Sequence, residues 1–113
     1  MGLCITRAVG TGWFGGVDLD TRRPEDTYTH KVWVTRIRDG QNKRSVVLQI
    51  DSDSGDREAR ELGLDEEFSL DECTVTLIGI GFNNQGIEKI EARLKLTAPL
   101  DYKIIRNNAR ERR

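Results

Sequence analysis

The chain has 113 residues, the size of one domain, and 33% of them are charged while 36% are hydrophobic. This composition is typical of a soluble globular protein with a modest core. The formal net charge of −1 excludes a basic field over the whole surface, so any nucleic-acid site must be a local patch. No stretch resembles a signal peptide or a membrane span, and we therefore expect a cytoplasmic protein.

Short runs with alternating or β-branched residues follow one another along the chain and predict strands. The expected strands cover residues 3–7, 31–38, 44–50, 67–70, 74–80, 87–96 and 102–106. Turn-forming residues 39–43 and 81–86 predict two hairpins. Residues 12–17 form a Gly-rich stretch, 18–29 a polar loop, and 56–62 (DREAREL) a helix that Gly63 ends. We predict one compact all-β domain over residues 1–113, an interwoven small β-barrel or sandwich of antiparallel strands with one short helix.

Charge is unevenly spread along the chain. Residues 51–72 are acidic, whereas residues 103–113 are basic. This asymmetry predicts a basic end for an anionic partner and an acidic segment elsewhere.

The sequence offers little material for a catalytic or metal site. His30 is the single histidine and has no nucleophile motif near it, so we expect a surface histidine and no enzyme. Residues 51–56 resemble a calcium-binding loop, but Gly55 and Leu62 stand where that loop needs oxygen ligands. Cys4 and Cys73 lie in apolar runs, which favours two buried, reduced thiols. We expect no cofactor and no metal.

The two ends of the chain carry the most informative motifs. Residues 3–10 (LCITRAVG) resemble the opening L-x-L-T-R-R-V-G of the carbon storage regulator (CsrA/RsmA) family. Residues 74–79 (TVTLIG) and 93–99 (RLKLTAP) resemble its third and fourth strands. Residues 98–106 (APLDYKIIR) then match A-P-x-x-V-x-V-x-R, with the arginine in register. The chain is thus similar to this family at several motifs in the right order.

The resemblance implies an RNA-binding translational regulator that binds GGA-containing hairpin loops or single strands of mRNA or small RNA. In that family, interwoven strands form a homodimer, and each RNA site joins the first strand of one subunit to the last strand of the other. The physics agrees, because strand edges can read unstacked bases and arginine pairs with phosphate. Carried over by position, the RNA-binding residues are Ile5, Thr6, Arg7, Ala98, Pro99, Tyr102, Ile104 and Arg106.

The chain also departs from the family. Ala8 stands where the family usually has a second arginine, which should weaken phosphate contact. The chain is about twice the family's length, and either an insertion at residues 11–64 or a tandem fusion would explain the excess. We favour the tandem, with a degenerate first unit at 1–62, a second unit at 63–106 that has lost its first strand, and a basic tail at 107–113. Such a chain would be a monomeric pseudo-dimer with one composite RNA site.

Two other interpretations stay open. The chain could keep the fold but act as a protein-interaction module, using the acidic segment 51–72 to antagonise or modulate a true regulator. It could also be an unrelated β-barrel with chance motif matches. No DNA or membrane partner is expected.

Overall fold

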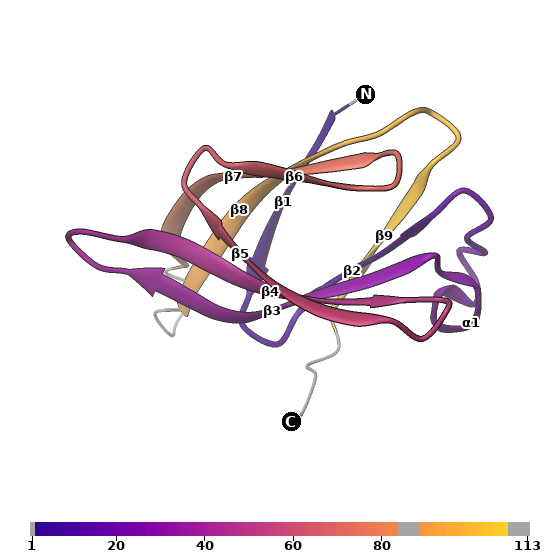
Figure 1. The fold of residues 1–113 in the computed structure, drawn as a ribbon, viewed down its shortest axis with the longest axis horizontal. Helices are drawn as coiled ribbons and strands as arrows, with labels where there is room; N and C mark the ends of the chain where they lie inside the picture. The colour runs from indigo at the N-terminus through magenta and orange to yellow at the C-terminus, as the bar shows by residue number, and fades with distance from the viewer. Residues whose placement is uncertain (1, 84–88, 109–113) are drawn as a thin grey trace.

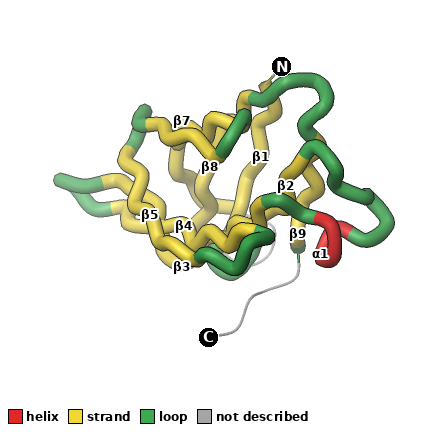
Figure 2. The backbone as a smooth tube through the Cα atoms, turned by 45° about the vertical axis from the view of Figure 1, so that its right-hand side comes forward, coloured by secondary structure: helices red, strands yellow, loops and turns green. Residues whose placement is uncertain are grey.

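The computed structural model describes residues 2–83 and 89–108 and confirms the all-β fold class. Its strands are β1 (Gly2–Ala8), β2 (Gly12–Gly16), β3 (His30–Asp39), β4 (Arg44–Ser52), β5 (Arg57–Gly63), β6 (Glu67–Leu70), β7 (Cys73–Asn83), β8 (Lys89–Thr97) and β9 (Lys103–Asn107). The helix α1 (Pro24–Thr27) lies in the loop after β2 (Figure 2). Residues 84–88 of the predicted second turn and 109–113 of the predicted tail lie outside the described part of the chain.

The strands form two antiparallel sheets that pack face to face (Figure 1). One sheet has four strands in the order β1-β8-β7-β6, and the other has five in the order β5-β4-β3-β2-β9. Each sheet mixes strands from both halves of the chain, because β1 joins β8 while β9 joins β2. The halves are therefore interwoven.

Alternation along the long strands builds the core. Side chains of a strand point to opposite faces in turn, and the inward set of each sheet meets that of the other. Members of this set are almost completely buried, at 2% exposure or less: Ile5, Trp13, Val32, Val34, Val46, Leu48, Ile50, Val75, Leu77, Leu94 and Leu96. Burial of this apolar surface is the main force that holds the two sheets together.

The helix predicted at residues 56–62 is wrong. The segment is strand β5, which pairs with β4 in a continuous antiparallel register from Ser45↔Gly63 to Asp51↔Arg57. Ala, Glu, Arg and Leu favour a helix locally, but the edge of β4 offers a full ladder of backbone hydrogen bonds. Tertiary pairing therefore overrides local propensity. The expected Gly-rich stretch and polar loop also contain regular structure, namely β2 and α1.

The backbone repeats itself across the two halves of the chain. The turn from β1 to β2 has Gly10 at φ 90°, and the turn from β5 to β6 has Asp65 at φ 66°. The Gly10 amide donates to Val34 O over 2.7 Å, and the Asp65 amide donates to Leu77 O over 2.8 Å. These turns match one for one.

The following strands continue the repeat. A bulge interrupts β3 between Val34 and Arg36, and another interrupts β7 between Leu77 and Gly79, each opposite the next strand of its own half. Strands β1 to β4 thus correspond to β5 to β8, with the division at the turn of residues 53–56. From the sequence we predicted a division after Leu62 and a second unit that has lost its first strand. That prediction is wrong, because β5 fills the place of this first strand.

Strand β9 has no counterpart in the first half among the described residues. It makes the β2 sheet five-stranded, while the equivalent strand β6 ends its sheet. The fold is therefore a two-fold repeat with one strand missing. This asymmetry makes the two ends of the sandwich chemically different.

Candidate nucleic-acid interface

Strands β1 and β9 are edge strands of different sheets, and both end on the same side of the sandwich (Figure 1). There the Arg7 guanidinium donates to Asn108 Oδ1 over 2.8 Å and to the Asn107 carbonyl oxygen over 3.5 Å. The contact spans a hundred residues of sequence. The structure thus brings the first and last strands together.

The register shows which side chains of β1 face this junction. Residues opposite one another in an antiparallel pair share a face of the sheet. Leu3, Ile5 and Arg7 lie opposite residues that are fully buried between the sheets, namely Leu96, Leu94 and Ala92. These three residues of β1 therefore lie on the inner face. Thr6 lies opposite Arg93 on the outer face and is exposed.

The same reasoning orients β9. Ile104 lies opposite Gly15, and Arg106 lies opposite Trp13, which is buried between the sheets at 1% exposure. Ile104 and Arg106 therefore also lie on the inner face. Because both strands are edges, their inner side chains border a gap that opens to solvent.

A groove of about 390 Å³ lies in this gap beside the first residues of β1. Its lining is mainly apolar and consists of Gly2, Leu3, Leu96, Ala98, Pro99, Tyr102 and Ile104. Tyr102 is 8% exposed and packs on Gly15, whose lack of a side chain leaves room for the phenol ring. Burial raises the pKa of Tyr102, and the neighbouring Cys73, Asp71 and Glu72 raise it further, so the hydroxyl stays neutral and keeps its proton.

Two arginines, Arg7 and Arg106, lie at the other end of the gap, near the last residues of β1 and β9. Partial burial lowers the pKa of Arg7, the nearby Arg106 lowers it further, and Glu91 opposes the shift. Two like charges held close together repel each other, and an anion between them would relieve that repulsion. The arrangement combines an apolar groove with a cationic end, which suits a ligand with a flat apolar part and a phosphate.

The structure gathers most of the predicted site residues and separates two from them. Ala98, Pro99, Tyr102 and Ile104 line the groove, while Arg7 and Arg106 lie farther along the gap, near the last residues of β1 and β9. Ile5 lies in the core at 2% exposure, and Thr6 lies on the outer face. Gly2, Leu3 and Leu96 line the groove but were not predicted. The alternation of residues 3–7, which places Leu3 on the same face as Arg7, was the signal that could have found Leu3.

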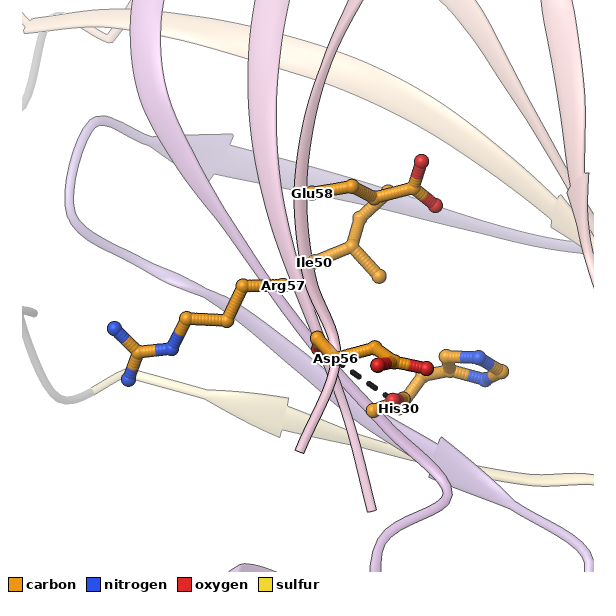
Figure 3. Close-up of a pocket in the computed structure, with 6 residues that line it drawn as sticks. His30, Ile50, Asp56, Arg57 and Glu58 are labelled. Atoms are coloured by element: carbon orange, nitrogen blue, oxygen red, sulfur yellow. Dashed lines mark hydrogen bonds between the residues drawn. The ribbon is translucent and has the colours of Figure 1, made fainter. Parts of the chain in front are cut away.

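The repeat generates a second groove, of about 430 Å³, at the equivalent place beside β5 (Figure 3). Arg57 and Glu58 stand where the first groove has Gly2 and Leu3. Ile50 and Ser52 stand where it has Leu96 and Ala98. The whole lining is His30, Ile50, Ser52, Asp56, Arg57 and Glu58. No described strand takes the place of β9 here, so this groove is polar and lacks the paired arginines.

Two expectations about single side chains are wrong. His30 is not a surface residue, because its side chain is 12% exposed and its Nδ1 lies 3.5 Å from Asp71 Oδ2. Cys4 is exposed rather than buried, although both cysteines are free thiols. Cys73 is buried, and burial raises its pKa to about 11. Of the calcium-like residues 51–56, the first two end β4 and residues 53–56 form the turn between β4 and β5, with Gly55 at φ 93°.

Two searches of residues 2–83 and 89–108 add to this account. No cluster of three or more His, Cys, Asp or Glu side chains there could hold a metal ion. None of the helices in this part is long and apolar enough to cross a membrane. Comparisons of the chain with protein-family models, curated proteins and solved structures gave no match.

Proposed function

We propose that the protein binds GGA-containing single-stranded or hairpin-loop RNA in the composite site between β1 and β9 and thereby regulates translation. The observation that carries this proposal is the junction of two edge strands, where Arg7 of β1 donates to the Asn107 carbonyl oxygen next to Arg106 of β9, beside a gap that also holds an apolar groove. The resemblance to the carbon storage regulator family supports the same assignment, since that family joins a first and a last strand at each RNA site.

The groove favours single-stranded RNA over a duplex. An unstacked base offers a flat face to the apolar lining and free edges to the backbone of β1 and β9, whereas a duplex hides both. Arg7 and Arg106 would pair with the phosphates that follow the inserted base. Tyr102, at 8% exposure, would add the accessible part of its ring to the apolar wall against which a base packs.

The second groove is a poor RNA site. Glu58 puts a negative charge where Leu3 lines the first groove, and Asp56 adds another at the same rim. A phosphate there would meet these carboxylates and one arginine, Arg57, which already lies 3.4 Å from Asp51. The proposal is therefore one RNA per chain, bound by a monomer whose two halves stand in for two subunits.

A binding titration tests the proposal. A labelled RNA hairpin with a GGA loop should saturate at one RNA per chain, and an otherwise identical hairpin with a CCU loop should bind much more weakly. Arg106→Ala should weaken the GGA hairpin at least about tenfold. Arg22→Ala is the matched control, because Arg22 is an exposed arginine on the loop after β2, and it should leave binding unchanged.

Two further measurements complete the test. Sedimentation of the free protein should show a monomer, and a reporter transcript with the GGA hairpin over its ribosome-binding site should be translated less when the protein is added. Two RNA molecules per chain would overturn the single-site proposal. Absence of GGA-dependent binding at low salt would overturn the RNA-binding function itself.

A further inference from the structure

Strand β6 exposes a backbone edge at a position that is filled in the other sheet. In the repeat, β6 corresponds to β2: Glu67 to Gly12, Phe68 to Trp13 and Leu70 to Gly15, because each pairs with the matching residue of β7 or β3. Strand β2 has β3 on one side and β9 on the other, whereas β6 has β7 alone among the described strands. Its outer amide and carbonyl groups can therefore accept a further strand.

The inner side of this edge is apolar, as a strand-binding surface requires. Phe68 and Leu70 alternate inward at 7% and 5% exposure, and Leu64 is 36% exposed just before β6. The Arg60 guanidinium lies 5.0 Å from the centre of the Phe68 ring. Phe68 corresponds to Trp13 in the repeat, and Trp13 lies beside β9 in the other sheet. At Phe68 the Arg60 side chain, rather than a strand, covers the ring. The Arg60 side chain is 47% exposed, so its charged end borders solvent at the place that an incoming side chain would occupy.

The charge around the edge specifies what kind of strand fits. Residues 64–73 contain five acidic side chains and no lysine or arginine: Asp65, Glu66, Glu67, Asp71 and Glu72. All five are exposed. Strand β9, which fills the corresponding place beside β2, carries Lys103 and Arg106. A strand that pairs with β6 would meet an acidic rim, so complementarity favours a basic segment with alternating apolar residues.

We propose that the β6 edge binds an extended basic segment of a partner protein, which adds as a fifth strand to the β1-β8-β7-β6 sheet. Backbone hydrogen bonds would supply affinity, the acidic rim would select basic sequences, and apolar side chains would pack near Phe68 and Leu64. A partner is favoured over a second copy of this chain. The copy's own β9 is held by a five-residue register with β2 and would have to leave its sheet.

A synthetic peptide with the sequence of residues 99–108 (PLDYKIIRNN) is the probe, since this segment already fits the corresponding place beside β2. Fluorescence anisotropy should show saturable binding, and hydrogen exchange should show new protection at residues 67–70. The double variant Glu67→Lys/Glu72→Lys should bind at least about tenfold more weakly. Glu25→Lys is the matched control, because it makes the same kind of charge change on exposed α1.

Four outcomes would overturn this proposal. The first is unchanged binding by the double variant while its thermal unfolding stays normal, and the second is equal binding of a peptide with Lys103→Glu and Arg106→Glu. The third is protection confined to β1 and β9. The fourth is a concentration-dependent dimer that the double variant abolishes, which would assign the edge to a second copy. Repeating the GGA-hairpin titration on the single variant Glu67→Lys separates the two proposals, because Glu67 lies on β6, whereas Glu72 neighbours Tyr102 of the RNA site.

Discussion

Replacing Arg106 with glutamine should weaken RNA binding while slightly stabilising the fold. In the free protein, Arg106 and Arg7 repel each other, and the lowered pKa of Arg7 reflects this repulsion together with burial. Arg106 is exposed on an edge strand, so its removal leaves no cavity. Glutamine keeps most of the length of the side chain and removes its charge. If the replacement stabilises the fold but weakens RNA binding, the role of Arg106 is in binding and not in folding.

The expected magnitudes are small for stability and large for binding. A like-charged pair near solvent costs about 0.2–0.5 kcal/mol, so the free energy of unfolding should rise by up to about 0.5 kcal/mol. That gain corresponds to an increase of roughly 2 °C in Tm for a domain of this size. Loss of a charged hydrogen bond to phosphate costs about 1.5–3 kcal/mol, which is roughly a 10- to 150-fold loss of RNA affinity.

Salt dependence gives a second, independent magnitude. Each phosphate contact to single-stranded RNA contributes about 0.7 to the slope of log K against log salt concentration. Arg106→Gln should therefore reduce that slope by about 0.7, and the double variant Arg7→Gln/Arg106→Gln by about 1.4. Fluorescence anisotropy with a GGA hairpin from 50 to 200 mM salt, roughly the range in which such contacts weaken, measures both quantities.

Calorimetry of the free protein measures the stability change. The control Arg22→Gln should change neither the slope nor the Tm, since Arg22 is exposed and lies on the loop between β2 and β3, outside strands β1 and β9. A clear loss of stability in Arg106→Gln would refute the reasoning, because Arg106 would then be a structural residue. An unchanged salt slope would refute the phosphate contact.

Three further predictions concern the fold. Leu48→Ala should lower the free energy of unfolding by about 2–5 kcal/mol in urea melts, whereas Leu100→Ala, at 81% exposure, should change it little; equal effects would contradict the assigned core. At pH 8 a thiol reagent should modify exposed Cys4 quickly and Cys73 only after unfolding, because the buried thiol has its pKa raised to about 11; rapid double labelling would contradict this. Gly12→Ala should unfold the protein or separate β2 from β3, since a Cβ there would lie 1.8 Å from the Val32 carbonyl oxygen; a normal circular-dichroism melt would contradict this.

The strands with regular alternation could be predicted from the sequence, but those set by pairing could not. Residues 44–50 alternate clearly, and β4 was found with the same start. Strand β5 has no such pattern, because five of its seven side chains are exposed and helix formers fill it. Strand β2 is buried at every position and contains three glycines, so it shows neither alternation nor β propensity. Strand β2 forms because its backbone pairs with β3 on one side and β9 on the other.

The site was predictable only where a family motif named its residues. Arg7 and Arg106 stand about a hundred residues apart, and nothing in their local sequence indicates that they meet. The resemblance placed them together, and the fold brings them to one junction. Ile5 was assigned to the RNA because it lies inside the motif, but alternation sends it inward to the core. Motif membership gives position, while face and burial come from pairing.

The missing strand explains why the two ends of this protein can differ. In a homodimer, one sequence builds both composite sites, so any substitution changes both. Here two repeated halves lie in one chain, and β9 completes only the end next to β1. The first groove is lined by apolar residues and lies in the same gap as Arg7 and Arg106, while its counterpart contains Glu58 and the β6 edge has an acidic rim. A net charge of −1 thus conceals a local pair of arginines at one end of the sandwich and an acidic rim at the β6 edge, the two features on which the RNA and partner-strand proposals rest.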